Sequence, residues 1–224
     1  MPGRETVLAN NQIYHIVNRG IAHQPLFLTK RDYRRAIDAL FYYQNSNPPI
    51  RYSKFLTLSR SRREELLKLS QRRQNFLGEI ICYCLMPNHF HFLVRQLKNN
   101  GISTLISNFS NSYTKYFNTK NRRRGPILEG KFKAIRIETD EQLLHVSRYI
   151  HLNPYTGYVV KNLNELENYP YSSFSEYLGK TQLELCSKNI ILTQFKNPFL
   201  YKKFVFDNAN YQRELDKIKH LLLE

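Results

Sequence analysis

The chain has 224 residues and carries 34 Lys and Arg against 18 Asp and Glu, so its formal net charge is +16. A protein this basic usually binds polyanions such as nucleic acids. Hydrophobic residues make up 42% of the chain and aromatic residues 13%, which excludes the composition of disordered proteins and predicts a folded domain. The longest apolar stretches are far shorter than the roughly 20 residues of a membrane-spanning helix, so we expect no such helix.

The N-terminus and the cysteines indicate the compartment. The opening sequence, Met-Pro-Gly-Arg-Glu-Thr, lacks the apolar core of a secretory signal, so we expect the protein in the cytoplasm. Cys82, Cys84 and Cys186 lack the paired spacing of a disulfide framework, and we expect them to be reduced. Cys82 and Cys84 lie two apart in an apolar run, which favours burial on one face of a strand over a role as metal ligands.

Most of the excess positive charge falls in two windows, at 51–75 and 115–136. The first contains eight Lys and Arg against two Glu, and the second contains eight against Glu129 alone. Clustered cations are what phosphate contacts need. The first window interleaves its charges with leucines, so it is either a polyanion contact or a solvated helical face. The second includes the cationic turn Asn-Arg-Arg-Arg-Gly-Pro at 121–126, which we expect to contact a polyanion.

Apolar periodicity and turn residues predict most of the elements. In chain order they are a strand at 13–17, a helix at 31–44, an inserted segment at 46–75 with a short extended piece and a basic helix, paired strands at 76–86 and 89–96, a helix at 101–116 and a strand at 132–137. A turn at Pro87-Asn88 makes the paired strands a β-hairpin.

A further helix should follow the last strand. Thr139-Asp-Glu-Gln142 matches a capping box and predicts its start. We expect the helix to end near Leu152, because Pro154 disfavours helical geometry at Asn153. The order of the elements predicts an α+β fold with a ferredoxin-like antiparallel sheet, helices on one face, this added helix and a C-terminal helical extension that closes in an amphipathic helix at 209–223.

Two histidines stand two positions apart at the start of the hairpin's second strand. Strand alternation directs His89 and His91 to one face, while Phe90, Phe92 and Val94 pack on the other. Two imidazoles at a fixed separation form a natural metal pair. The motif alone does not distinguish a metal pair from hydrogen-bonded surface histidines.

The predicted helix after Thr139 places polar side chains along one stripe. His145, Tyr149 and Asn153 are four residues apart, whereas Leu143 and its apolar neighbours form the stripe that docks on the sheet. The amide oxygen of Asn153 could complete a metal site beside Tyr149. Spacing alone favours the alternative that Tyr149, one of 16 tyrosines, packs at an edge.

The motifs together resemble the single-tyrosine transposases of the HUH superfamily, and within it the REP-associated tyrosine transposases of the IS200-like family. The resemblance rests on Cys-Leu-Met-Pro-Asn before His89-Phe-His91, and on Ser-Arg-Tyr149-Ile-His-Leu-Asn153-Pro. It is supported by Tyr-His-Ile-Val-Asn-Arg-Gly at 14–20, by Tyr-Thr-Lys-Tyr-Phe-Asn at 113–118 and by Gly-Pro-Ile-Leu-Glu-Gly-Lys-Phe-Lys at 125–133. It covers residues 14–178.

The resemblance implies a metal-dependent transposase and endonuclease. His89 and His91 would bind Mg²⁺ or Mn²⁺ with Asn153, although this family often has Gln at the third position. Tyr149 would be the nucleophile that forms a 5′-phosphotyrosine link. The substrate would be single-stranded DNA beside a foldback hairpin, and the enzyme would be a monomer or a homodimer.

The resemblance also implies where the domains lie and which residues contact DNA. We expect a catalytic domain at 1–178, which includes the basic insertion at 46–75, and a C-terminal extension at 179–224. The second cationic window lies just before the tyrosine helix, so we expect its side chains to hold the hairpin: Lys115, Arg122, Arg123, Arg124, Lys131, Lys133 and Arg136. Arg19 and His15, on the first strand, have either a DNA contact or a structural role.

Two alternatives remain open. The chain could be a decayed or domesticated relative that binds hairpin DNA or RNA without cutting it. A more remote possibility is a zinc hydrolase that uses His89, His91 and either Cys82 or Cys84. The complete set of His89, His91, Tyr149 and Asn153 favours the enzyme, because a binding module does not need it.

Overall fold

The computed structural model describes residues 6–70, 73–181 and 184–214. In chain order its elements are β1 Ile13–Arg19, a 3-10 turn at Ile21–His23, α1 Lys30–Tyr43, α2 Tyr52–Phe55, α3 Arg60–Ser70, a 3-10 turn at Arg73–Asn75, β2 Gly78–Met86, β3 His89–Gln96, α4 Gly101–Lys120, β4 Lys133–Ile137, α5 Asp140–Thr156, α6 Leu163–Glu167, α7 Phe174–Tyr177, α8 Asn189–Leu192 and α9 Pro198–Phe206. The helix predicted at 209–223 is described only as far as residue 214, and its remainder lies outside the described residues.

The four strands form one antiparallel sheet in the order β2-β3-β1-β4. Helix α1 connects β1 to β2, the β2-β3 hairpin follows, and α4 connects β3 to β4. This succession of strand, helix, hairpin, helix and strand is that of a ferredoxin-like fold. The predicted α+β class and sheet are therefore confirmed.

The described residues form two compact units. The first comprises 6–70, 73–79, 87–89 and 94–136, and the second comprises 80–86, 90–93, 137–181 and 184–214. Helices α1 to α4 thus belong to the first unit, and α5 to α9 belong to the second. The boundary expected after residue 178 stays a prediction.

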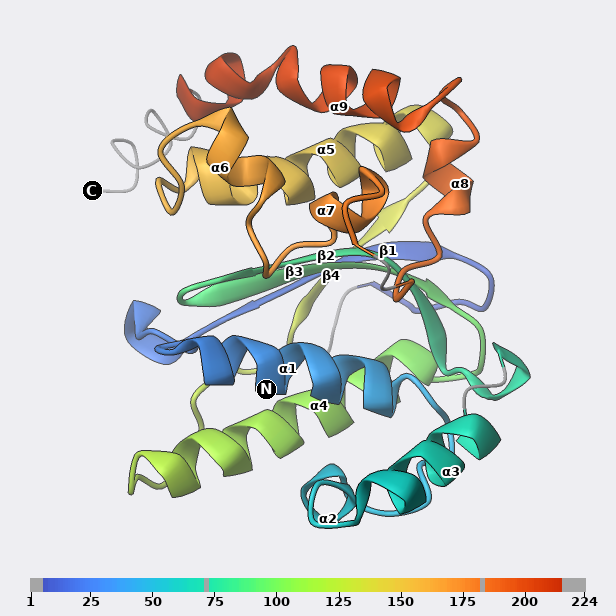
Figure 1. Ribbon diagram of the computed structural model, residues 1–224, viewed down its shortest axis with the longest axis vertical. Coiled ribbons are helices and arrows are strands. Elements are labelled where there is room, and N and C mark those ends of the chain that lie inside the picture. The colour runs from blue at the N-terminus through green and yellow to red at the C-terminus, as the bar shows by residue number, and fades with distance from the viewer. Residues whose placement is uncertain (1–5, 71–72, 182–183, 215–224) are drawn as a thin grey trace. The chain divides into compact units, whose positions relative to one another are not determined.

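Helices α1 and α4 lie side by side in the first unit (Figure 1). Buried apolar side chains recur on both helices with helical periodicity, among them Leu40 of α1 and Leu105 and Phe109 of α4. Helix α4 continues for one turn beyond the predicted end at residue 116 and buries Phe117.

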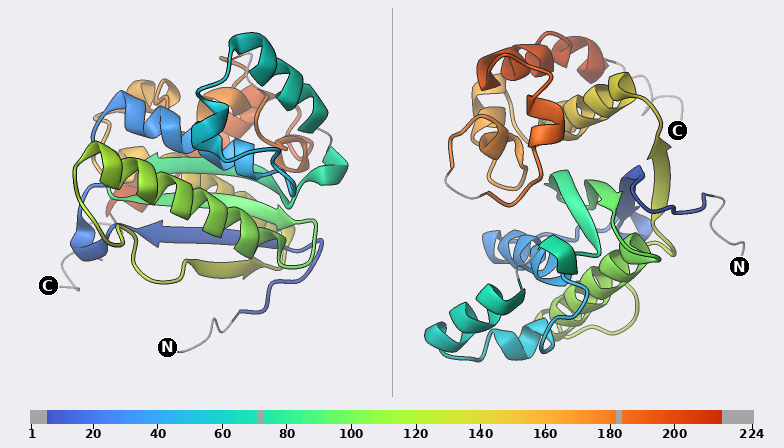
Figure 2. Two further views of the ribbon diagram at one scale, coloured as in Figure 1. Left: turned by 90° about the horizontal axis from the view of Figure 1, so that it is seen from below. Right: turned by 90° about the vertical axis from the view of Figure 1, so that its right-hand side faces the viewer.

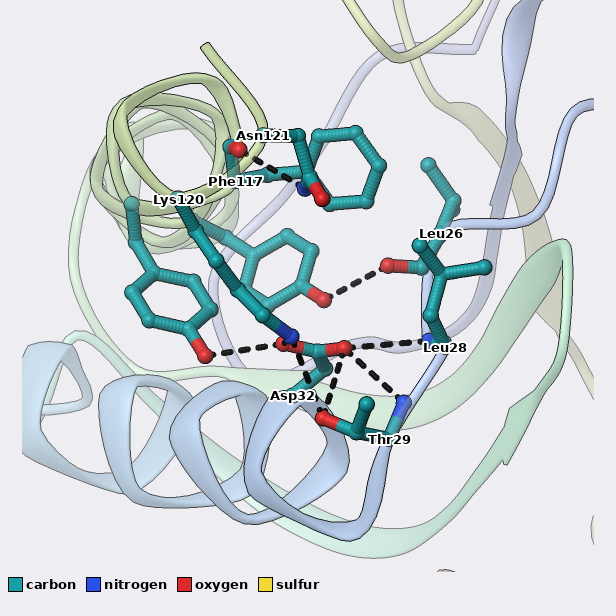
Figure 3. Close-up of polar contacts among 9 residues, drawn as sticks. Leu26, Leu28, Thr29, Asp32, Phe117, Lys120 and Asn121 are labelled. Atoms are coloured by element: carbon teal, nitrogen blue, oxygen red, sulfur yellow. Dashed lines mark hydrogen bonds and ion pairs between the residues drawn. The ribbon is translucent and has the colours of Figure 1, made fainter.

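A buried carboxylate joins the start of α1 to the last turns of α4 (Figure 3). Asp32 is wholly buried, and its Oδ2 accepts hydrogen bonds from the backbone N–H groups of Leu28 and Thr29 at 3.1 and 2.9 Å. Its Oδ1 accepts from the Tyr116 hydroxyl at 2.8 Å and from Lys120 Nζ at 2.6 Å. A buried charge is tolerated only when it is paired and hydrogen-bonded, so this network fixes how the two helices pack.

Residues 52–55 before α3 form a helical turn, whereas a short extended piece followed directly by the basic helix was predicted. Helix α2 lies beside α3 in the first unit (Figure 2). Tyr52 and Phe55 of α2 lie one turn apart and pack on Tyr42 of α1, with ring centroids 4.9 and 5.0 Å away. A helical turn places residues three apart on one side, which an extended chain cannot do. Burial of these two rings therefore selects the helix.

Helix α3 confirms the predicted basic helix and has the character of a solvated face. Arg60 pairs with Glu64 at 2.8 Å, and Arg62 pairs with Glu65 at 2.5 Å. All four side chains are more than half exposed. Arg72, which the first cationic window includes, lies outside the described residues.

In the second unit, α5 and α9 lie side by side (Figure 1). The first half of the predicted capping box is present, because Thr139 Oγ1 accepts from the Gln142 N–H at 3.2 Å. The Gln142 side chain reaches one residue further back than expected, to the N–H of Glu138 at 2.8 Å.

The predicted end of α5 near Leu152 is wrong, because the helix continues through Pro154 to Thr156. Leu152 and Tyr155 are both buried, so the last turn of α5 packs inside the second unit. This packing outweighs the loss of the backbone hydrogen bond that proline cannot donate. Gly157 then ends the helix, and its N–H donates to the Asn153 carbonyl at 2.8 Å.

Among the described residues, no helix is long and apolar enough to cross a membrane.

The Asp32 network predicts a measurable share of stability. Asp32→Ala removes the buried carboxylate that accepts from Tyr116, from Lys120 and from two backbone N–H groups, so the free energy of unfolding should fall by about 3 kcal/mol at pH 7 in urea titrations. Glu64→Ala, which removes a carboxylate from an exposed ion pair, should leave it unchanged within error.

The same carboxylate sets a pH dependence. Burial raises the pKa of Asp32, but hydrogen bonds from Lys120, Tyr116 and Thr29 outweigh burial and lower it overall. Its stabilisation is therefore complete above the unfolded pKa of about 3.9 and is lost as the pH falls through the lower folded value. The gap between wild type and Asp32→Ala should shrink between pH 7 and pH 2. A gap that widens in acid would contradict the network.

Candidate nuclease site

The histidine pair opens β3. His89 is half-buried, and its Nδ1 lies 2.7 Å from the side-chain oxygen of Asn88. His91 follows two residues later and is buried. The alternation of the strand directs both imidazoles to one face, as predicted. Phe90 and Phe92 alternate with them and stack on each other, with ring centroids 4.4 Å apart and both rings buried.

The second unit brings His91 and Tyr149 together. The two rings meet edge to face, with centroids 5.4 Å apart and planes at 90°. Tyr149 is neither buried nor fully exposed, so its ring has a fixed neighbour while part of it meets solvent. The residue predicted as the nucleophile, on α5, and one residue predicted as a metal ligand, on β3, are therefore neighbours.

Asn153 lies one helical turn after Tyr149 and is buried. Its Nδ2 donates a hydrogen bond to the Tyr149 backbone carbonyl at 2.9 Å. This bond orients the amide and assigns Oδ1 as the atom that could ligate a metal. Asn153 therefore sits on the α5 stripe where the sequence pattern placed it.

His145, the first member of that stripe, is engaged elsewhere. Its Nδ1 lies 2.7 Å from a guanidinium nitrogen of Arg148, and its ring contacts Phe204 of α9. Arg148 also stacks on Phe204, with its guanidinium carbon 4.6 Å from the ring centroid. His145 and Arg148 thus attach α5 to α9.

His151 has a structural role that sequence reasoning missed. Its ring is wholly buried, with Nδ1 2.7 Å from the Tyr201 hydroxyl and Nε2 2.9 Å from Ser173 Oγ. Tyr201 in turn donates to Ser147 Oγ at 3.2 Å, one turn before His151 on α5. Ser173 Oγ accepts from the N–H of Tyr83 in β2 at 2.9 Å. The imidazole therefore connects α5 to both α9 and β2.

The protonation state of His151 suits this bridging role. Burial lowers the pKa of its imidazole to about 3, so the ring is neutral at physiological pH. A neutral imidazole offers one donor and one acceptor, and two hydroxyl groups can satisfy both. The sequence signal was a pair of polar residues, Ser147 and His151, four apart on an otherwise apolar helix face.

Cys82 and Cys84 are buried on β2, as predicted. Cys82 and Cys84 are wholly buried free thiols, and burial raises both of their pKa values. Within the described part of the chain, no group of three His, Cys, Asp or Glu side chains could hold a metal ion. The zinc hydrolase alternative therefore has no support there.

The cationic turn after α4 contains one anchored and two exposed arginines. Arg123 donates to Gln24 Oε1 at 2.6 Å and to the Pro126 carbonyl at 3.4 Å, so its guanidinium fixes the turn. Arg122 and Arg124 are exposed. These two side chains are the ones that the turn presents to solvent.

The remaining predicted DNA contacts differ in their surroundings. Exposed cations are Lys115 on α4 and Lys131, Lys133 and Arg136 around β4. Arg136 donates to Gln12 Oε1 at 2.9 Å, and Arg19 lies 3.8 Å from Glu129. Burial lowers the pKa of His15 to about 4, so His15 adds no positive charge at neutral pH. Their contacts with DNA stay predictions.

Known proteins support the family resemblance. The family model described as "Transposase IS200 like" matches residues 51–153, a segment that includes His89, His91, Tyr149 and Asn153. None of the curated protein sequences matches this chain. Among solved structures, the chain is similar to a REP-associated tyrosine transposase bound to a REP hairpin, with 14% identity and a TM-score of 0.54 over 84% of this chain and 98% of that one. The similarity to IS200-like transposases is thereby confirmed.

The His151 bridge should be essential to the stability of the second unit. His151→Ala creates a cavity and leaves the buried Tyr201 and Ser173 hydroxyl groups with one partner fewer, so the free energy of unfolding should fall by about 3 kcal/mol. Lys161→Ala, which shortens an exposed side chain of the same unit, should change it by less than about 0.5 kcal/mol. Urea unfolding of both variants measures this, and equal stabilities would refute the bridge.

Proposed function

We propose that this chain cleaves and rejoins single-stranded DNA beside foldback hairpins, with Tyr149 as the nucleophile. The observation that carries the proposal is the edge-to-face contact of Tyr149 with His91, at 5.4 Å between ring centroids. The matched family model and the shared fold with a hairpin-bound transposase support it.

The chemistry follows from the phenol. The Tyr149 oxygen attacks the scissile phosphorus in line, forms a Tyr–O–P bond and expels the 3′ oxygen of the neighbouring nucleotide. The phenol loses its proton and the departing 3′ oxygen gains one. The phosphodiester energy is kept in the 5′-phosphotyrosine link, so a second 3′-hydroxyl can attack that link and join two strands without ATP.

The proposed metal ligands are His89, His91 and Asn153. A bound Mg²⁺ or Mn²⁺ would polarise the non-bridging oxygens of the scissile phosphate and help orient it. The donor set fits such an ion, because imidazole nitrogens and an amide oxygen are both ligands of divalent metals. All three donors are neutral, so the ion would keep its charge for the phosphate. Asn153 is held in position by its bond to the Tyr149 carbonyl.

The proposed hairpin contacts come from the cationic window that precedes the tyrosine helix. Arg122 and Arg124 are exposed on the turn that Arg123 anchors, and Lys131, Lys133 and Arg136 follow around β4. Side chains arranged in this way can follow a phosphate backbone. Single-stranded DNA would add base faces that can stack on aromatic side chains.

A second candidate function is binding of hairpin DNA or RNA without cleavage. It needs the cations but neither Tyr149 nor the three metal ligands. The contact between Tyr149 and His91 and the orientation of Asn153 favour the enzyme.

A tyrosine substitution separates the two candidates. The full chain, incubated with single-stranded hairpin DNA and Mn²⁺, should form a covalent protein–DNA adduct that resists denaturing electrophoresis. Tyr149→Phe removes the attacking oxygen and should abolish the adduct while it leaves hairpin affinity within about twofold, because a phenyl ring keeps the packing.

Tyr158→Phe is the matched control, because Tyr158 is an exposed tyrosine of the same unit. It should form the adduct at the wild-type level. Hairpin binding without any adduct from the wild-type protein would support the binding module instead.

A further inference from the structure

A cavity of about 1130 Å³ lies in the first unit among α1, α2 and α4. Its walls come from three stretches that are far apart in the sequence, at 31–38, 43–56 and 108–120. None of the lining residues is Tyr149 or one of the three proposed metal ligands. The cavity is therefore a site with residues of its own.

The cavity is strongly cationic. Among the described residues that line it, one is acidic, Asp38, and the cations are Arg31, Arg34, Arg35, Arg51, Lys115 and Lys120. Asp38 pairs with Arg34 at 3.3 Å, and Lys120 pairs with Asp32. Arg51 and Lys115 are exposed and form no ion pair with any residue that the structure describes. The fold thus joins Arg51 of the first cationic window to Lys115 of the second.

Arg35 is the most constrained of these cations. It is only 8% exposed, and its guanidinium carbon lies 4.2 Å from the Tyr52 ring centroid and 5.4 Å from that of Tyr116. Its buried Nε has no hydrogen-bond partner among the described residues. Buried guanidinium donors are normally satisfied, and a planar guanidinium held between rings is pre-organised for a phosphate.

The rest of the lining matches the chemistry of nucleotides. Tyr116 presents a partly exposed ring, and Asn108, Asn111 and Ser112 offer neutral donors and acceptors. Rings beside cations suit a strand whose bases stack while its phosphates pair with positive charge. The volume exceeds the roughly 300–1,000 Å³ of small-molecule pockets, which favours a strand over one free nucleotide.

We propose that this cavity binds a short segment of single-stranded DNA, with Arg35 on one phosphate and Arg51 and Lys115 on others. The site rests on the cavity alone and does not require Tyr149 to be a nucleophile. It gives the segment at 46–75 a function, because Arg51 and α2 form one wall of the cavity.

The test measures the affinity of a fluorescent oligothymidylate of about ten nucleotides, too simple in sequence to form a hairpin, by anisotropy at several salt concentrations. The Tyr149→Phe chain serves as the parent protein, so that no covalent reaction interferes. In that background, Arg51→Ala with Lys115→Ala should weaken binding at least about 10-fold. The slope of log Kd against log salt should fall by about 1.4, because each contact with a single-strand phosphate contributes about 0.7.

The matched control is Arg60→Ala with Arg62→Ala, which removes two exposed cations of α3 that do not line the cavity. It should weaken binding less than about twofold, since distant charges are screened by salt. Equal losses in both double variants would mean unspecific attraction and would overturn the proposal. Unchanged affinity in the cavity variant would also overturn it.

Two further experiments test whether the ligand is a strand or a free anion, and whether the planar guanidinium of Arg35 matters. Displacement of the strand by micromolar thymidine monophosphate or inorganic phosphate would assign the cavity to a free anion and overturn the strand proposal; resistance to millimolar amounts supports it. Arg35→Lys keeps the charge but loses the planar stack, so it should weaken binding at least about fivefold, with folding verified by circular dichroism. The covalent adduct on a hairpin is measured separately, so either proposal can fail alone.

Discussion

The position of the tyrosine helix depends on one buried imidazole. His151 is two residues from Tyr149 on α5, and it binds Tyr201 of α9 and Ser173, which is itself bonded to β2. In-line attack on a phosphate requires the reacting atoms to be held about 3–3.5 Å apart in the correct orientation. A helix fixed at several points can hold a phenol in this way, whereas a frayed helix end cannot. The position of the Tyr149 phenol therefore depends on the hydrogen bonds that His151 makes.

In the first unit, too, one buried polar side chain fixes the packing of helices, but here it is a charged carboxylate and not a neutral imidazole. Asp32 is a buried carboxylate that fixes α1 against α4, and Arg35 lies one turn further along α1, between two aromatic rings. Because the two helices cannot slide without breaking the Asp32 network, the cavity between them keeps its shape. Two groups of cations thus stand out in the chain, one around the turn at 121–126 and one that lines this cavity.

The elements that follow from local periodicity and capping were predicted correctly from the sequence. The features that depend on packing between distant parts of the chain were not. The hairpin and its alternating His89, Phe90 and His91 follow from a period of two, and the start of α5 follows from the Thr139 cap. The predicted end of α5 was wrong because the burial of Tyr155 outweighs the local effect of Pro154. The helix α2 was missed because Tyr52 and Phe55 pack on α1. His151 and the cavity could not be found, since their partners come from remote parts of the chain.

The most direct measurement of the central claim is the identity of the residue that carries DNA. After the reaction with hairpin DNA and Mn²⁺, the adduct is digested with protease and nuclease, and the remaining nucleotide-bearing peptide is sequenced by mass spectrometry. The account predicts a single peptide from α5 with a nucleotide joined through its 5′ phosphate to Tyr149. A nucleotide on Tyr113, Tyr116 or Tyr155, or a 3′-phosphate link, would contradict it.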